Sequence, residues 1–387
     1  MNNKEASTNK KPNIFLRLLA LLITASLIAG ALALVIHRDR LNLQTLEHWL
    51  TYRNLDTQTA SVPFTHPGGE AISTAYLNDG ILFSSVSGAH YYSPSGELYT
   101  EQVLSMEHPI LSAGDRCGVV YDAGGQSLFL FRQAQQAFSL SLEGNSDLLS
   151  ARVNDSGWLT VTAQQSGYKG AVTVYDNNYE KVIQISLSST FVVDAALSPD
   201  CKTVAVATIS QKGGSFSSQI LLYPINQTQP SSTLDLGNMM VLDMDFESEL
   251  LWILGEEQLT TIHTNDNSMY SYSFGQQYLK GCDLDGDGFA LLLLGRYRTG
   301  NADTAITIDK DAQELASLSL NKQVLDFDCN TGYCSLLTGS DLSIYNPFFA
   351  LQTSFEDTQG ARYTALDQSG NALLANSQQA WLYISSK

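Results

Sequence analysis

The sequence predicts an all-β protein built from one unit that is repeated around a ring. Three observations support this: short apolar runs alternate with polar turns from residue 61 onward, these runs recur about every 40 residues, and each repeat holds about four of them. β-Branched and aromatic residues favour strands, whereas Gly, Ser, Asn and Asp favour turns. About 40 residues with four strands per repeat is typical of a β-propeller.

The repeats are predicted to begin 37 to 49 residues apart, at Ile72, Pro109, Leu148, Phe191, Met240, Leu279, Gln323 and Arg362. The second strand of each repeat is the most apolar, as in LLWILG (250–255), which is expected where neighbouring blades cover both faces of a strand. The last repeat ends after three strands, and ASVPFT (60–65) is predicted to supply its fourth strand and close the ring. We therefore predict a single propeller over 61–387 with eight blades; seven blades is the alternative.

An apolar segment precedes the repeats. Residues 14–36 carry one charge, Arg17, and as a helix they would span roughly 34 Å, enough to cross a bilayer core. Lys10 and Lys11 precede the segment, so the positive-inside rule predicts a cytoplasmic N-terminus and an extracytoplasmic propeller. The alternative is a cleaved signal peptide, for which this apolar segment is longer than usual.

Two shorter regions flank this predicted transmembrane helix. Residues 1–13 are predicted to be a cytoplasmic tail, too short to fold alone. Residues 37–60 are predicted to form a juxtamembrane stalk and linker, because Leu43, Leu46 and Leu50 recur at helical spacing. The predicted localisation is thus the cell membrane, with a single pass.

The charge distribution excludes nucleic acid as a partner. The formal net charge is −18, from 21 Lys and Arg against 39 Asp and Glu. Seven of the basic and four of the acidic residues lie in 1–60, which leaves 14 basic and 35 acidic residues for 61–387. A domain this acidic repels a phosphate backbone.

One stretch carries a resemblance to known repeats. VDAALSPDCKTVAVAT (193–208) resembles a WD40-like repeat of the PD40 type, with Cys201 where Gly is usual. With its apolar segment and the stretches VYDNNYEKVIQ (174–184) and FALLLLGRYRTG (289–300), the whole chain resembles a family of single-pass, membrane-anchored β-propeller proteins of Gram-positive anaerobic bacteria. That resemblance implies a fold and a location, and no chemistry.

Catalytic and cofactor motifs are sparse. Asp283, Asp285 and Asp287 in DLDGDG resemble a calcium loop, since alternating carboxylates can converge on one cation. The alternative we favour is a solvated turn, so we expect no cofactor, with calcium as the other possibility. No nucleophile elbow or phosphate-binding loop occurs, so we expect no enzymatic activity. A propeller enzyme acting on envelope glycans or peptides is the alternative function.

The cysteine pattern leaves one pairing open. Of five cysteines, Cys329 and Cys334 flank a turn-like stretch. They are predicted either to form a hairpin disulfide outside the cytoplasm or, the alternative we favour, to be two small buried residues.

Three segments predict a binding surface. Residues 164–170, 209–217 and 295–302 are predicted to be long connections between the second and third strands of repeats three, four and six, all on one face. They hold no acidic residue and are rich in basic and aromatic ones: Tyr168, Lys169, Lys212, Phe216, Arg296, Tyr297 and Arg298. We predict a binding or scaffolding module for an envelope protein or an anionic wall component; ordinary solvated loops are the alternative.

Overall fold

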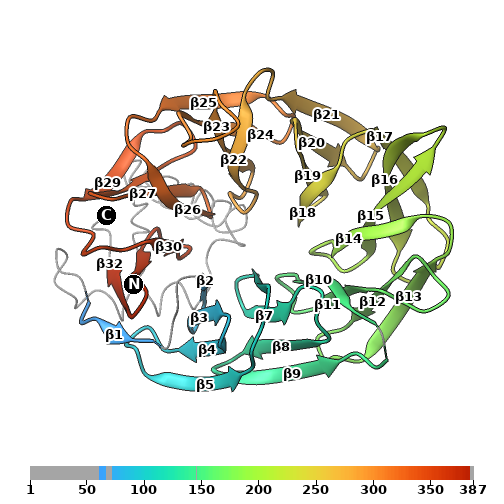
Figure 1. Ribbon diagram of the computed structural model, residues 1–387, viewed down its shortest axis with the longest axis horizontal. Coiled ribbons are helices and arrows are strands. Elements are labelled where there is room, and N and C mark those ends of the chain that lie inside the picture. Colours follow the sequence, from blue (N-terminus) through green and yellow to red (C-terminus); the bar gives the residue numbers. More distant parts are fainter. Residues whose placement is uncertain (1–60, 67–71, 145, 384–387) are drawn as a thin grey trace, which may run out of the picture. The chain divides into compact units, whose positions relative to one another are not determined.

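The computed structural model describes residues 61–66, 72–144 and 146–383, and this part of the chain contains 32 β-strands. The strands form eight antiparallel sheets of four, arranged as the blades of a ring (Figure 1). The predicted eight-bladed propeller is confirmed. The predicted tail, transmembrane helix and stalk lie outside the described residues, and within the described ranges no helix is long and apolar enough to span a membrane.

In each blade the strands follow one another from the centre of the ring to its rim (Figure 1). The first strands are β2 (Ile72–Leu77), β6 (Pro109–Ala113), β10 (Leu148–Val153), β14 (Phe191–Leu197), β18 (Val241–Glu247), β22 (Tyr278–Asp283), β26 (Val324–Asn330) and β30 (Tyr363–Leu366). The second strands are β3 (Gly80–Ser85), β7 (Cys117–Asp122), β11 (Leu159–Ala163), β15 (Thr203–Lys212), β19 (Leu250–Gly255), β23 (Phe289–Gly295), β27 (Tyr333–Thr338) and β31 (Ala372–Ala375).

The two outer strands of each blade complete the sheets. The third strands are β4 (Gly88–Tyr92), β8 (Ser127–Arg132), β12 (Gly170–Tyr175), β16 (Ser215–Pro224), β20 (Gln258–His263), β24 (Thr304–Asp309), β28 (Leu342–Tyr345) and β32 (Gln379–Tyr383). The fourth strands are β5 (Leu98–Val103), β9 (Gln135–Ser141), β13 (Lys181–Leu187), β17 (Ser232–Gly237), β21 (Ser268–Ser273), β25 (Glu314–Ser319), β29 (Leu351–Phe355) and, for blade eight, β1 (Phe64–Thr65). Every predicted repeat start lies within one residue of the observed first strand.

Blade eight is completed by chain from the N-terminal side, as predicted. β1 runs antiparallel to β32, with Phe64 opposite Ala380. The Ser61 N–H donates to the Leu382 carbonyl (2.9 Å), and Ser61 Oγ accepts from the Leu382 N–H (2.8 Å). This pairing covers the open edge of the last sheet and joins the two ends of the ring.

The hydrophobic core is divided among the contacts between blades. A cluster of buried apolar side chains lies between each blade and the next. Alternate residues of a strand point to opposite faces of the sheet. In β19, for example, Leu251 and Ile253 face blade four while Trp252 and Leu254 face blade six. Burial on both faces explains why the second strands are apolar throughout.

Candidate functional site

The three segments predicted to form a binding surface lie on one face of the ring. Within a blade, the end of the second strand pairs with the start of the first: Ile209 lies opposite Phe191, and Gly295 lies opposite Tyr278. The turns between second and third strands therefore share a face with the connections between blades. We call this face the loop face. Blade two follows the same pattern, since Asp122 at the end of β7 lies opposite Pro109 at the start of β6.

The blade-four segment is not a loop, so that expectation was wrong. β15 and β16 pair without interruption from Thr203–Pro224 to Lys212–Ser215, and only Gly213 and Gly214 form the turn. Both glycines have positive φ, +62° and +90°, as a type I′ hairpin turn requires. β14 pairs only as far as Ile209 and β17 only as far as Ser218, so the tip of the hairpin projects beyond the blade.

The basic residues of the loop face are partly engaged by neighbours. Lys169 Nζ lies 4.0 Å from the ring centroid of Phe191, a cation–π contact. Arg296 Nε lies 3.0 Å from Asp303 Oδ2, and this hydrogen-bonded ion pair raises the pKa of Arg296. Lys212 lies in β15, and its side chain is outside what the structure describes.

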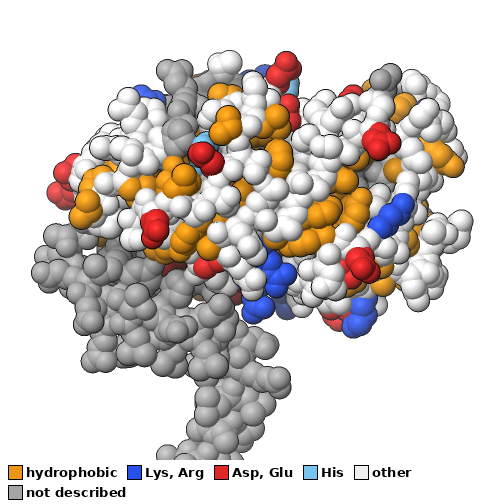
Figure 2. All heavy atoms as spheres, turned by 90° about the horizontal axis from the view of Figure 1, so that it is seen from below, with side chains coloured by type: hydrophobic (Ala, Val, Ile, Leu, Met, Phe, Trp, Pro, Cys, Tyr) orange, Lys and Arg blue, Asp and Glu red, His pale blue; other side chains and the backbone are white. Residues whose placement is uncertain are grey.

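Exposed apolar side chains are a further feature of the loop face, and only some of them were predicted from the sequence. Tyr297, Phe216 and Tyr168 are 74 %, 64 % and 47 % exposed. Among the residues that the structure describes, the large exposed hydrophobic ones on this face are Val86, Val103, Ile110, Tyr168, Phe191, Phe216, Met240, Leu242, Tyr278 and Tyr297. Seven of these ten belong to blades three to six. Hydrophobic side chains are not confined to the loop face, because the part of the rim seen in Figure 2 also shows bands of them among scattered charged side chains.

The described chain enters and leaves the ring on the opposite face. β32 begins at the loop face, after the turn at 376–378, and ends at Tyr383. Because β1 is antiparallel to β32 and Ser61 pairs with Leu382, Ser61 also lies at the face away from the loop face.

Near the centre of the ring, one arginine joins three blades. Arg152 on β10 places Nη2 2.6 Å from Asp194 Oδ2 on β14 and 2.5 Å from Asp243 Oδ1 on β18. Nε donates a further hydrogen bond to Asp194 Oδ2. Only 24 % of the Arg152 side chain is exposed.

Carboxylates continue this arrangement in blades six to eight. Asp283 accepts from the Cys329 N–H (2.8 Å), Asp326 from the Thr364 N–H (2.8 Å), and Asp328 from the Leu366 N–H (2.6 Å). Each carboxylate thus binds a backbone donor of the next blade's first strand. The first strand is the inner edge of its sheet, so its outward-facing N–H groups have no neighbouring strand to bind. The carboxylates accept hydrogen bonds from these N–H groups instead.

Burial raises the pKa values of these carboxyl groups and of Asp245, which lies on β18. The pKa of Asp245 is raised to about 7, and those of Asp283 and Asp326 are raised to about 6. Burial also raises the pKa of Asp328 well above the ordinary value. We call Asp245, Asp283, Asp326 and Asp328 the axis carboxylates.

The DLDGDG stretch is a turn whose first carboxylate is already engaged. Asp283 Oδ1 accepts from the Asp285 N–H, and its other oxygen binds blade seven. Asp285 keeps exposed surface, yet the pKa of its carboxyl is raised because protein crowds it and Asp245 and Asp283 are near. Among the described residues no group of three or more His, Cys, Asp or Glu is arranged to hold a metal ion. The calcium interpretation stays a prediction.

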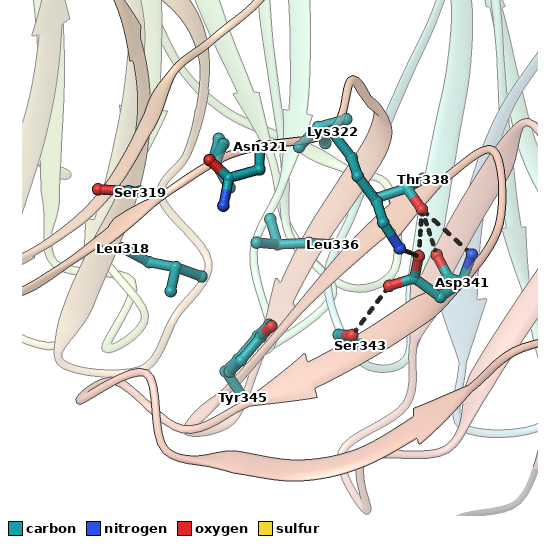
Figure 3. A pocket seen from close by; sticks show the side chains of 11 residues that line it. Leu318, Ser319, Asn321, Lys322, Leu336, Thr338, Asp341, Ser343 and Tyr345 are labelled. Atoms are coloured by element: carbon teal, nitrogen blue, oxygen red, sulfur yellow. Dashed lines mark hydrogen bonds and ion pairs between the residues drawn. The ribbon is translucent and has the colours of Figure 1, made fainter.

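A pocket of about 180 Å³ lies between blades six and seven (Figure 3). Leu318, Val324 and Leu336 supply apolar lining, while Lys322 and Asp341 form an ion pair of 2.5 Å. Partial burial acts to raise the pKa of Asp341, but hydrogen bonds from Lys322, Ser340 and Thr338 lower it to about 2. The charges at this pocket therefore satisfy each other.

A family model matches residues 56–356 and is described as a family of unknown function, DUF5711. The chain belongs to this family. Among curated protein sequences no relative matches this DUF5711 protein.

Solved structures support the fold of the DUF5711 chain. The C-terminal WD40 domain of Sif2 has a TM-score of 0.56 and 12 % identity, covering 84 % of this chain and 96 % of that one. BamB from Moraxella catarrhalis has a TM-score of 0.51 and 11 % identity, covering 84 % and 99 %. The computationally designed Ika8 protein has a TM-score of 0.57 and 12 % identity, covering 82 % and 98 %. At such identities the likeness shows the propeller fold alone.

Of the axis carboxylates of the DUF5711 propeller, the sequence analysis had singled out only Asp283. A signal for others was present, because an Asp-x-Asp pair occurs at the same position in the first strands of repeats five and seven, in VLDMDFE (241–247) and VLDFDCN (324–330). Such a recurring pair indicates a role common to the repeats.

Proposed function

We propose that this DUF5711 protein is a membrane-anchored, extracytoplasmic propeller that binds a protein of the bacterial cell envelope through its loop face. One observation carries the proposal: large apolar side chains are exposed on the loop face over blades three to six. Aromatic side chains, Met and Arg are enriched in protein–protein interfaces, and this set includes Tyr168, Phe216 and Tyr297.

The composition of the face supports a polypeptide partner over an anionic wall polymer. Tyr and Arg, which are favoured at binding hot spots, occur together at Arg296, Tyr297 and Arg298. Lys169 already contacts Phe191, and Arg296 is already paired with Asp303. Apolar contact, more than net positive charge, is therefore what the face offers.

The predicted anchor at 14–36 gives the propeller its place in this proposal. The anchor fixes the domain at the membrane surface, and the propeller acts there as a rigid, passive scaffold whose loop face presents the binding residues.

The binding proposal is tested with paired variants on opposite faces. Phe216→Ser/Tyr297→Ser removes two exposed aromatic side chains from the loop face. Phe348→Ser/Leu351→Ser is the matched control, because these residues are 65 % and 55 % exposed at the other face. Both variants should unfold thermally like wild type, since exposed substitutions seldom change stability by more than about 0.5 kcal/mol.

The full-length proteins are compared by crosslinking in envelope membranes. We expect one specific protein adduct with wild type and with the Phe348/Leu351 control, and its loss with the Phe216/Tyr297 variant. Equal adducts from all three proteins would contradict binding through the loop face.

The anchor is tested separately. Full-length protein should stay in the membrane pellet through alkaline carbonate extraction, whereas a chain lacking residues 14–36 should not. Release of the full-length protein by carbonate would contradict the anchored arrangement.

A further inference from the structure

Two cysteines face each other across the innermost hairpin of blade seven. Cys329 on β26 is in register with Cys334 on β27, and the two residues are 3 % and 0 % exposed. Both belong to the core cluster between blades six and seven. Their side chains therefore point to the same side of the sheet.

The hairpin geometry brings these two residues close together. Thr331 and Gly332 form a two-residue turn with φ of 41° and 81°, as in type I′ hairpins. The pair next to such a turn, Asn330 and Tyr333, is the hydrogen-bonded one, so the following pair, Cys329 and Cys334, is not hydrogen-bonded. Consistent with this, the Cys329 N–H points away from β27 and donates to Asp283 of blade six.

A pair of this kind matches the geometry of a disulfide. The Cα atoms of a non-hydrogen-bonded antiparallel pair are about 4.5 Å apart, and its side chains approach most closely. Disulfides join residues whose Cα atoms are about 4.4–6.8 Å apart. In addition, burial and then the neighbouring Cys334 thiol raise the pKa of Cys329, as expected for two thiols that lie close together.

We propose that Cys329 and Cys334 form a cross-strand disulfide when the chain folds in the presence of a disulfide oxidant. One cysteine thiolate attacks a sulfur of the oxidant and releases one thiol, giving a mixed disulfide. The second cysteine then displaces the other thiol. The two cysteines lose two electrons and two protons, and the oxidant is reduced to two thiols.

The other three cysteines do not compete for this pairing. Cys282 packs into the cluster between blades five and six, on the other face of blade six. Cys117 lies in the cluster between blades two and three, and Cys201 packs against the cluster between blades three and four.

The crosslink forms during folding rather than in the finished ring. In the native protein both thiols are covered, and burial raises the pKa of Cys329, which leaves little thiolate to react. Once formed, the bond fixes β26, the strand that contacts blade six through the Cys329 N–H and blade eight through Asp326 and Asp328.

The wild-type chain tests the proposal without a variant that could fail to fold. Full-length protein is made by in vitro translation in detergent, in parallel with a reductant and with a mixture of reduced and oxidised glutathione. Folded, protease-resistant protein from each is then denatured and treated with maleimide. We expect five alkylated thiols after reducing synthesis and three after oxidising synthesis, with Cys329 and Cys334 protected.

Peptide mass identifies the bond. Lys322 and Arg362 bound one tryptic peptide that contains both cysteines and no other Lys or Arg. In the oxidised sample it should be unalkylated and about 2 Da lighter than the dithiol. A Cys117→Ala control should still lose two reactive thiols on oxidation, and Cys334→Ala should lose none. Full alkylation of Cys329 and Cys334 in folded, oxidised protein, or a bond from either to another cysteine, would overturn the proposal.

Discussion

Replacing Arg152 tests whether the centre of the ring is held by charge. Arg152→Met keeps much of the side chain's length but removes the guanidinium that joins Asp194 and Asp243. Breaking a buried ion pair by removing one partner costs about 3–5 kcal/mol, because the remaining charge is left uncompensated. The Asp194 side chain is only 10 % exposed and carries that full penalty, whereas Asp243 is 45 % exposed and is largely screened by water. We therefore expect a loss of about 3 kcal/mol.

Urea unfolding at pH 7.5, followed by tryptophan fluorescence, measures this loss. The matched control is Arg152→Met/Asp194→Asn/Asp243→Asn, which removes the stranded charges together with the arginine. It should be more stable than Arg152→Met alone, because a neutral amide is far cheaper to bury than an unpaired carboxylate. A loss below about 1 kcal/mol for Arg152→Met, or a triple variant less stable than the single one, would refute the reasoning.

Three further predictions concern stability. The pKa values of Asp245, Asp283 and Asp326 are raised to about 7, 6 and 6, so the folded state binds more protons than the unfolded state between about pH 4 and pH 7. Stability then falls as pH rises through that window, and the melting temperature should be higher at pH 5 than at pH 8; the reverse order would contradict it. Gly281→Ala would place a Cβ 2.4 Å from the Phe327 ring and should cost about 1–3 kcal/mol in urea, with partial recovery in Gly281→Ala/Phe327→Leu; an unchanged midpoint would count against this packing. Phe64→Ala, which removes ring contacts at 5.3 Å to Tyr92 and 6.3 Å to Phe83, should lower stability by about 2 kcal/mol if β1 closes the ring, and no loss would argue against closure.

Much of the fold could be predicted because burial leaves a strong trace in the sequence. A second strand such as LLWILG must be apolar on both faces, and this pattern recurs at the period of the blades. The missing strand of blade eight was also predictable, since an open edge requires a partner and residues 60–65 were the remaining extended segment.

The projecting hairpin of blade four gave no such trace. Residues 210–217 extend beyond the neighbouring strands, so both faces are uncovered and the sequence is polar and glycine-rich like a loop. Only the Gly213-Gly214 pair marked a tight hairpin turn.

The candidate site was predicted only in part. The sequence indicated which segments share the loop face, because strand order in a propeller determines the side of each turn. It did not reveal the exposed apolar residues at the starts of first strands, such as Phe191 and Tyr278, because similar residues one position further on are buried or partly buried. The pairing of Arg296 with Asp303 depends on a turn conformation that spacing alone does not fix.

Site-specific photo-crosslinking in intact cells distinguishes binding through the loop face from binding through the opposite face. A benzophenone amino acid is placed at Tyr297 on the loop face and, in a second protein, at Phe348 on the opposite face; both positions are well exposed. We expect a discrete protein adduct from position 297, competed by excess wild-type protein, and no such adduct from position 348. The same adduct from both positions, or an adduct from 348 alone, would contradict binding through the loop face.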